Sequence, residues 1–394
     1  MKNLFKHRQW VICIAFLVLG ICGMCQWMHL NSIPEGFTTE EYLQDYDYLW
    51  EQLETDYIYF PVLQDMGIDI DLIKGQNRQV IEEQVADIYD YYLVLSDMCE
   101  SLHCLGHLDV LDYEGYQVFK NNLDFNLELR NVLYVPQTVE TYQSLQAHSS
   151  QIHDNADVLF EPETAYDPNH KAVIITISSF KYDNKDIIYE SLKLFGDYEV
   201  NHIIFDITGN PGGNDANWRD GIVALFEGTY TWEKRWYCRE TTLTQQWIWN
   251  ELDPVSVNTW GNDLLPGFVE DLDLTHCVVQ CDELVGKNLV PASLSAAQRW
   301  LLVDSGTYSS ADNFADFCKK TGWATLVGRN TGGDGATNSS VFCGLPNTGL
   351  VIRFKCGAQE NSKELLAATV GTIPDIISSK YDAPLTTLYD LIDD

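Results

Sequence analysis

The sequence predicts an α/β protein, and three apolar runs carry that prediction. Residues 172–177, 202–207 and 300–304 have the length and the β-branched and aromatic composition of buried strands. Helical spacing follows, most clearly over residues 183–195 and after Ser310. Strands that alternate with helices form a sheet through crossover connections. We expect two later runs, 323–328 and 349–354, to continue this alternation.

Composition limits the possible partners. The chain has 394 residues, with 24 Lys and Arg against 58 Asp and Glu, and a formal net charge of -34. Such a surface repels nucleic acid and anionic lipid, so neither is expected as a partner. Aromatic residues make up 12%, which is too many for a disordered acidic chain. The acidic residues are therefore expected on the surface of a packed protein.

The first 30 residues form the first predicted segment. Residues 1–8 are basic, and residues 10–28 are apolar except for Gln26. A helix of this length spans roughly 28 Å, about the thickness of the hydrocarbon core of a bilayer. The basic side stays in the cytoplasm, so we expect a single-pass signal-anchor in the cell membrane, with the rest of the chain extracytoplasmic. A cleaved signal peptide is the alternative.

A small helical domain is predicted over residues 31–115. Thr38 and Glu41 have the spacing of a capping box, and a second helical stretch is expected over residues 79–99. Residues 116–170 are predicted to connect this domain to the core, with a hairpin at most and without the glycine-rich loop of a PDZ domain.

Residues 171–394 are predicted to form the core. Within it, the aromatic stretch 230–249 is compatible with a hairpin, a lid over a pocket or a packing layer. The cysteines outside the first apolar run lack zinc-site spacing, so no metal is expected. Cys277 with Cys281 and Cys99 with Cys104 are possible disulfides, and buried free thiols are the alternative.

Two turns in the predicted core can support chemistry. Residues 304–310 lead from a strand into a helix and place serines at the helix N-terminus. A serine there can be a nucleophile whose oxyanion the helix stabilises, although a capping role is the simpler interpretation. Residues 209–213 form a glycine-rich turn after a strand without the spacing of a nucleotide-binding loop, so they provide either oxyanion-binding amides or a plain tight turn.

These turns and two further segments resemble the tail-specific, C-terminal processing peptidases and their tricorn-core relatives. Residues 205–213 are similar to the family's Asp-Leu-Arg-Gly-Asn-Pro-Gly-Gly, and 306–314 to its Ser-Ala-Ser-Glu nucleophile turn. Residues 326–333 resemble its Val-Gly-x-x-Thr-x-Gly strand and loop, and 371–375 its closing Gly-x-x-Pro-Asp. The resemblance implies a crotonase-like ββα core that hydrolyses peptide bonds through a serine acyl-enzyme, without a cofactor.

The resemblance also implies roles for individual residues. Alignment on the family's Ser-Ala-Ser-Glu makes Ser310 the nucleophile, with Ser309 as the alternative if the alignment shifts by one residue. The backbone amide of Ala311, with that of Gly212 or Gly213, would form the oxyanion hole.

The general base is inferred by the same comparison. The processing branch uses a lysine in the loop that here spans residues 331–337, and this loop has none. The tricorn-like branch uses a histidine after the N-terminal helices, which points to His107, with His103 second. A free imidazole has a pKa near 6.5, so activity is expected to rise through about pH 6–7.

A carboxylate that orients this histidine is expected near the closing turn. Glu364 is the predicted residue, with Glu360 and Asp334 as alternatives. The sequence thus predicts a membrane-anchored serine endopeptidase that acts on polypeptides. The alternatives are a catalytically degraded relative that binds peptides or acts as a scaffold, and an unrelated α/β hydrolase, which the missing Gly-x-Ser-x-Gly motif disfavours. The oligomeric state stays open.

Overall fold

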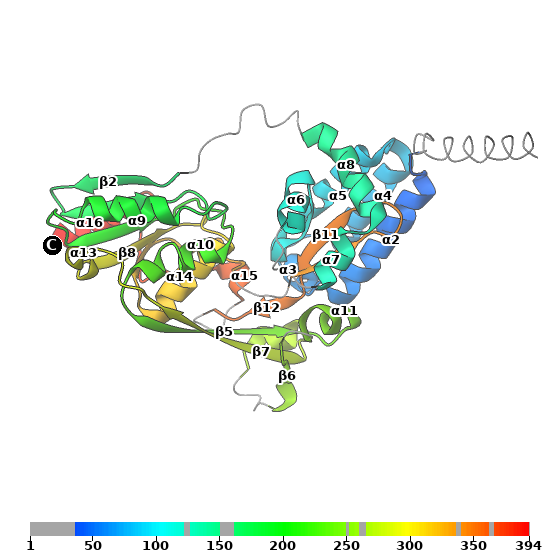
Figure 1. Cartoon of the computed structure of the whole chain (residues 1–394). Coiled ribbons are helices and arrows are strands. Elements are labelled where there is room, and N and C mark those ends of the chain that lie inside the picture. The colour runs from blue at the N-terminus through cyan, green and yellow to red at the C-terminus, as the bar shows by residue number, and fades with distance from the viewer. Residues whose placement is uncertain are drawn as a thin grey trace, which may run out of the picture.

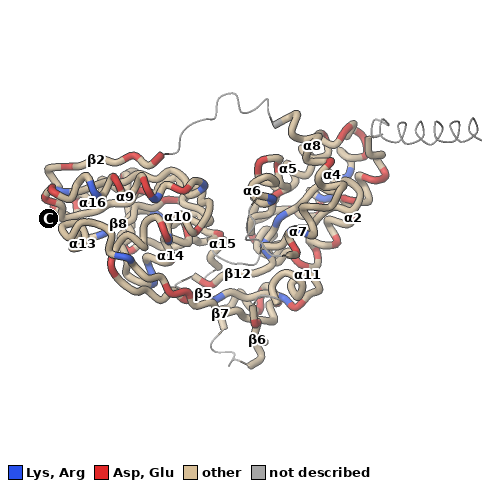
Figure 2. Tube along the Cα trace, in the orientation of Figure 1, with Lys and Arg blue, Asp and Glu red and all other residues tan. Residues whose placement is uncertain are grey.

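The computed structural model describes residues 36–121, 127–149, 161–249, 252–259, 265–335, 340–361 and 366–393. They form two lobes joined by a long hairpin (Figure 1). Figure 2 shows acidic residues over both lobes. None of the helices in these ranges has the length and apolar character needed to cross a bilayer. The predicted anchor at residues 10–28 lies outside the described residues.

The first lobe is built on a six-stranded sheet in the order β13-β9-β8-β4-β3-β2. Neighbouring strands are parallel except for the antiparallel pair β2 and β3. The predicted α/β class is therefore confirmed. The strands are β2 (Glu163–Asp167), β3 (Ala172–Thr176), β4 (His202–Asp206), β8 (Gln298–Val303), β9 (Thr325–Gly328) and β13 (Ile376–Ile377).

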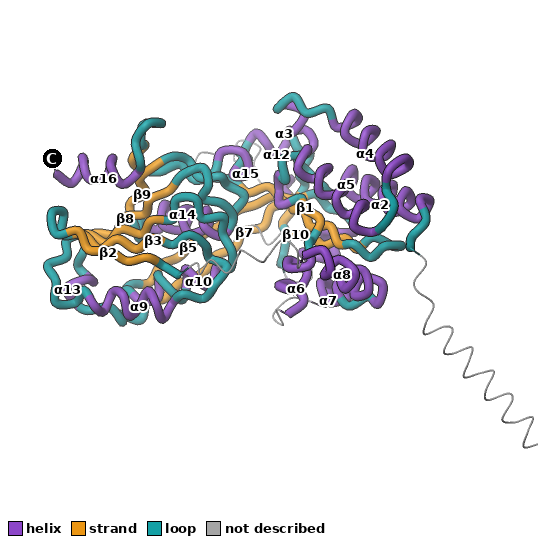
Figure 3. Tube along the Cα trace, turned by 90° about the horizontal axis from the view of Figure 1, so that it is seen from above, coloured by secondary structure: helices purple, strands orange, loops and turns teal. Residues whose placement is uncertain are grey.

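Alternating side chains of the central strands enter two different cores. Phe205 and Leu301 pack in one cluster with helices α9 and α14, whereas Ile204 and Leu302 pack with Leu388 of α16. Figure 3 shows α9 and α16 on opposite sides of the strands. Because both faces of these strands are buried, their sequences are continuous apolar runs. The helices of this lobe are α9 (Lys185–Leu194), α10 (Asp215–Arg219), α13 (Ala292–Ser295), α14 (Ser310–Thr321), α15 (Ala367–Val370) and α16 (Pro384–Asp393).

The aromatic stretch supplies the hairpin between the lobes. Strand β5 (Thr229–Cys238) pairs with β7 (His276–Val285) along its whole length. Trp232 is buried in the core of the first lobe and Trp236 in that of the second. The stretch is therefore a packing element shared by both cores. The elements that accompany it are β6 (Val255–Ser256), β12 (Gly357–Gln359), α11 (Thr242–Thr244) and α12 (Gly267–Asp271).

The second lobe is mainly helical. Thr38 and Glu41 form the predicted capping box at the start of α2. The expected helix over residues 79–99 is instead two helices, because the Asp87 side chain accepts hydrogen bonds from the amides of Tyr89 and Asp90 and so begins a new helix. The helices are α2 (Thr39–Asp56), α3 (Phe60–Asp65), α4 (Ile70–Gln84), α5 (Ile88–Ser101), α6 (Tyr113–Asn121), α7 (Leu127–Leu133) and α8 (Pro136–Ser149).

Two segments differ from their sequence-based interpretation. Residues 113–121 and 127–149, expected largely as a connection, form helices α6, α7 and α8 that contact one another. Strand β11 (Val351–Lys355), expected to continue the main alternation, pairs with β1 (Asp109–Val110) and β10 (Ser340–Gly344) in the helical lobe. The cysteines from Cys99 to Cys356 are free thiols in the described structure.

A buried carboxylate fixes the β10–β11 hairpin to the first helix of this lobe. Asp45 of α2 is fully buried and accepts hydrogen bonds from the amides of Asn347 (2.8 Å) and Thr348 (2.7 Å) and from the Thr348 hydroxyl (2.6 Å). Burial raises the pKa of Asp45. These contacts connect segments about 300 residues apart in the sequence.

We expect Asp45→Ala to lower the free energy of unfolding by about 3 kcal/mol, because three donors, two of them buried, would lose their acceptor. Urea denaturation of the purified protein measures this. Asp47→Ala on the same helix is the control, since Asp47 is 58% exposed and pairs with an exposed arginine. Its expected cost is below about 0.5 kcal/mol. Equal losses in the two variants would contradict the role of Asp45.

Candidate active site

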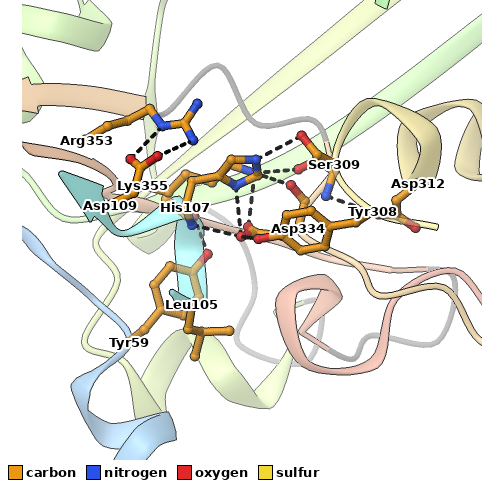
Figure 4. A network of polar contacts seen from close by, with 12 residues as sticks. Tyr59, Leu105, His107, Asp109, Tyr308, Ser309, Asp312, Asp334, Arg353 and Lys355 are labelled. Carbon is orange, nitrogen blue, oxygen red and sulfur yellow. Dashed lines mark hydrogen bonds and ion pairs between the residues drawn. The ribbon is translucent and has the colours of Figure 1, made fainter. Parts of the chain in front are cut away.

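Three segments from different parts of the chain meet between the lobes. The first is the single turn η1 (Leu105–His107), which follows α5 in the helical lobe. The second is the turn between β8 and α14, which contains Ser309 at the N-cap position of α14. The third is the loop after β9, which contains Asp334. Figure 4 shows His107 between Ser309 and Asp334.

The three side chains form a continuous hydrogen-bonded chain. His107 Nε2 lies 2.8 Å from Ser309 Oγ, and His107 Nδ1 lies 2.9 Å from Asp334 Oδ2. The backbone amide of His107 also donates to Asp334 Oδ2 at 2.9 Å. The carboxylate favours the tautomer with the proton on Nδ1, which leaves the Nε2 lone pair facing the serine hydroxyl. This is the arrangement of a nucleophile, a general base and a carboxylate that orients the base.

The structure brings Ser309 rather than Ser310 to the histidine. Ser310 is the first residue of α14, and its hydroxyl is buried without a hydrogen-bond partner among the described residues. Ser309 precedes the helix with φ 55° and ψ −120°, which turns its side chain away from that of its neighbour. The geometry therefore places Ser309, the alternative that a one-residue shift offered, against the histidine, whereas the hydroxyl of the predicted Ser310 makes no hydrogen bond to it.

The oxyanion-hole prediction shifts with the serine. The amide of Ala311 donates to the carbonyl of Tyr308 at 3.1 Å, and the amide of Gly212 donates to Asn210 Oδ1 at 2.8 Å. Of the three predicted donors, Ala311 and Gly212 are therefore engaged within the protein, whereas Gly213, among the described residues, is not. In the described part of the chain, the amides of Ser310 and Gly213 have no hydrogen-bond acceptor. They are better placed to bind an oxyanion at Ser309.

The glycine loop lies directly against the nucleophile turn. A Cβ at Gly212 would lie 2.8 Å from the Ser310 amide nitrogen and 2.9 Å from Ser309 Cβ. A Cβ at Gly213 would lie 2.1 Å from the carbonyl carbon of Phe180. Their φ values of 99° and 144° add a second requirement for glycine. Only a backbone without side chains fits this close to the serine.

The carboxylate of the site comes from one of the alternatives considered. Asp334 contacts His107, whereas Glu360 lies 3.4 Å from the Tyr237 hydroxyl and 4.0 Å from Arg235. The predicted Glu364 lies outside the described residues. His103, the second choice of base, is exposed.

The electrostatics keep the histidine neutral. Burial lowers the pKa of His107 to about 4, with the positive charge of Lys355 in the same direction, and this outweighs the attraction of Asp334. Burial alone would raise the pKa of Asp334, but Lys355, His107 and Tyr308 together hold it well below its ordinary value. The site therefore pairs an ionised carboxylate with a neutral imidazole at neutral pH.

Each of the three residues has a strained backbone. His107, Ser309 and Asp334 have φ values of 55°, 55° and 58°, and they account for three of the eight non-glycine residues with positive φ in the described chain. Each such conformation costs roughly 1–3 kcal/mol and persists only where the surrounding structure imposes it. Strain of this kind concentrates at functional sites. Among the described residues no group of three or more His, Cys, Asp or Glu side chains could hold a metal ion.

Comparison with known proteins places this geometry in context. The profile of peptidase family S41 matches residues 171–378, more than half of the chain. Mature CPAF has a similar fold, with a TM-score of 0.51 and 13% identity over 90% of this chain and 96% of the other. A peptidase-like protein from Parabacteroides merdae gives a TM-score of 0.52 and 14% identity over 89% and 96%. A search of curated proteins found no match.

Proposed function

The chain belongs to peptidase family S41, and on that premise we propose that it is a serine endopeptidase in which Ser309 is the nucleophile and His107 the general base. Membership of the family makes it a serine-type peptidase. The assignment of roles rests on one observation above all. A single imidazole lies within hydrogen-bond distance of a serine hydroxyl on one side and a buried carboxylate on the other.

The proposed reaction is acyl transfer in two steps. Ser309 Oγ attacks the carbonyl carbon of the peptide bond while its proton passes to His107 Nε2. The tetrahedral intermediate breaks the C–N bond, and the protonated His107 gives its proton to the leaving amine. Water then attacks the acyl-enzyme, with His107 again taking a proton, and the acid product leaves as Ser309 recovers its hydrogen. Asp334 stays ionised and stabilises the imidazolium in both steps.

The oxyanion is proposed to bind at the amides of Ser310 and Gly213. Two preorganised donors at this position stabilise the transition state, because they need no rearrangement as negative charge develops on the oxygen. Loss of one such donor typically lowers kcat by about 10²–10³-fold. The unengaged state of both amides supports this assignment.

The substrate is proposed to be a polypeptide, and the protein to be anchored in the cell membrane by residues 10–28. The apolar length of that segment and the basic residues 1–8 support the anchor and an extracytoplasmic catalytic domain. Fractionation of cells that express the full chain, followed by protease protection, tests this part separately from catalysis.

Catalysis is tested by covalent labelling and by cleavage of an unfolded protein. A fluorophosphonate should label the wild type at Ser309, as identified by mass spectrometry of the labelled peptide, and should not label Ser309→Ala. A folded wild type that neither reacts nor cleaves would instead favour the peptide-binding interpretation.

The low pKa of His107 predicts an unusual pH profile. Because His107 must be neutral to accept the serine proton and its pKa is about 4, kcat/KM should stay level down to about pH 5 and fall below it. This replaces the rise through about pH 6–7 expected for a free imidazole. Initial rates under kcat/KM conditions from about pH 3.5 to 9 measure the profile, with circular dichroism at each pH to verify folding. An acid limb with a midpoint at about pH 6.5 would show that burial does not lower the pKa of His107.

A further inference from the structure

The carboxylate of Asp334 is held by more than the histidine. Its Oδ2 accepts from the amide and Nδ1 of His107 and from the hydroxyl of Tyr308, at 2.9, 2.9 and 2.5 Å. Its Oδ1 lies 3.1 Å from Lys355 Nζ. The side chain of Asp334 is 2% exposed and that of Lys355 4%. Both carboxylate oxygens of Asp334 are therefore engaged, and the pair is almost completely buried.

Lys355 contacts the backbone of the same loop as well. Its Nζ donates to the carbonyl of Asp334 at 2.5 Å and to that of Gly335 at 2.8 Å. With the Asp334 side chain, these acceptors match the three N–H groups of an ammonium. Lys355 thus fixes both the side chain of Asp334 and the left-handed backbone that presents it.

Lys355 and His107 belong to the same lobe. Lys355 ends strand β11, which pairs with β1, and β1 begins two residues after His107. The loop that contains Asp334 follows β9 of the other lobe. The lysine therefore fastens the carboxylate to the lobe that provides the base.

Tyr308 makes a second connection from the nucleophile side. Its ring stacks on the imidazole of His107, with centroids 5.2 Å apart and an interplanar angle of 23°. Its hydroxyl donates to Asp334, and the next residue is Ser309. The side chain of Tyr308 thus contacts two members of the site, and its backbone is joined to the third.

We propose that Lys355 and Tyr308 are positioning residues of the proposed hydrolysis, which fix Asp334 against His107 and balance its negative charge. This inference rests on the proposed function. Neither side chain touches the serine hydroxyl in a hydrogen bond, so each acts through Asp334 and His107.

The charges around His107 give this proposal a distinct signature. Asp334 faces the imidazole from the loop after β9, and Lys355 and Arg353 lie on β11. Arg353 makes a bidentate pair with Asp109 at 3.0 and 2.9 Å, so its charge is already balanced. Lys355 is therefore the cation that offsets Asp334. Without it, the carboxylate would stabilise the imidazolium more strongly and raise the pKa of His107.

The test compares the pH profiles of Lys355→Met and Tyr308→Phe in the full chain. For Lys355→Met we expect the acid limb of kcat/KM to move up by about one pH unit and kcat to fall about tenfold with little change in KM. Lys355→Arg keeps the charge and should keep the acid limb near that of the wild type. Tyr308→Phe keeps the ring and loses only the hydroxyl, so a smaller shift in the same direction is expected.

Two controls remove the same chemical groups from buried positions elsewhere in the protein. Lys234 is also 4% exposed but pairs with Asp282 on the β5–β7 hairpin. Tyr116 is a buried tyrosine whose hydroxyl donates to the carbonyl of Leu133 at 3.0 Å. Lys234→Met and Tyr116→Phe should lower stability at most and leave the acid limb unchanged.

The outcomes separate this inference from the proposed function. An active wild type that depends on Ser309, with unshifted acid limbs in Lys355→Met and Tyr308→Phe, would overturn the positioning role alone. Activity that survives Ser309→Ala would overturn the proposed function itself. If Lys355→Met does not fold, Tyr308→Phe decides, because loss of one hydroxyl leaves no buried charge unpaired.

Discussion

Ser309→Ala is expected to abolish peptidase activity, with a loss of at least about 10⁴-fold in kcat/KM, because no other hydroxyl makes a hydrogen bond to His107 Nε2 among the described residues. Ser310→Ala is the matched control one residue away. It removes a buried hydroxyl without a partner and leaves the backbone amide of residue 310 in place. We expect its activity to stay within about threefold of the wild type, and its stability to rise by up to about 1 kcal/mol.

Both variants are measured by cleavage of an unfolded protein, with thermal unfolding to verify that each is folded. The reverse result, a dead Ser310→Ala beside an active Ser309→Ala, would restore the assignment made from sequence. Equal loss in both would indicate that the turn as a whole had been disturbed. In that case Ser309→Cys, which retains a nucleophilic side chain, separates chemistry from folding.

The ambiguity between the two serines has a simple physical origin. Ser309 precedes α14 with a left-handed φ of 55°, whereas Ser310 is the first residue of the helix, so the two side chains point in different directions. Only one of them can face the base, and a strand–turn–helix pattern in the sequence does not reveal which. One signal was present. Placing Ser309 at the first position of the family's Ser-Ala-Ser-Glu puts Asp312, an acidic residue, at the position of its glutamate.

The contacts of Asp312 give that signal a structural meaning. Its carboxylate accepts hydrogen bonds from the hydroxyls of Thr331 (2.5 Å) and Thr372 (2.7 Å) and from the amide of Gly335 (3.1 Å). An acid three residues after the nucleophile thus ties α14 to the loop that contains Asp334. These hydrogen bonds give a structural reason for an acidic residue at the fourth position of the motif.

The sequence predicts best those features that depend on residues close together in the chain. Continuous apolar runs predicted the central strands because both faces of that sheet are buried, and Thr38 with Glu41 predicted a helix start because a capping box needs only four residues. The placement of His107 relied on the family resemblance. It placed the histidine in a loop, and the structure brings that loop to the serine.

Local sequence patterns do not predict which distant strands pair with each other. Strand β11 joins a core formed mainly by residues that precede it by more than 200 positions, and nothing in its apolar pattern distinguishes that core from the main sheet. Lys355 was missed for this reason. The family resemblance points to a lysine within the loop 331–337, whereas the lysine of the site lies on β11 and pairs with an aspartate of that loop.

Asp334→Asn is expected to lower kcat by about 10⁴-fold while the protein still binds substrate. An amide can donate to His107 Nδ1 and so favour the tautomer with the proton on Nε2, which cannot accept the serine proton. It also cannot stabilise the imidazolium that forms in each step. Glu364→Gln is the comparison, since Glu364 was the carboxylate predicted from sequence, and we expect it to keep wild-type activity.

Loss of Asp334 also leaves the buried Lys355 without its counter-charge, so stability must be separated from chemistry. The double variant Asp334→Asn with Lys355→Met removes both charges and should unfold at a higher temperature than Asp334→Asn alone. Its kcat should nevertheless stay low, because the missing element is the carboxylate that orients His107. Recovery of activity together with stability would mean that Asp334 serves the fold and not the reaction. In that event Glu364 would become the residue to examine, since the serine and histidine would still need an acid.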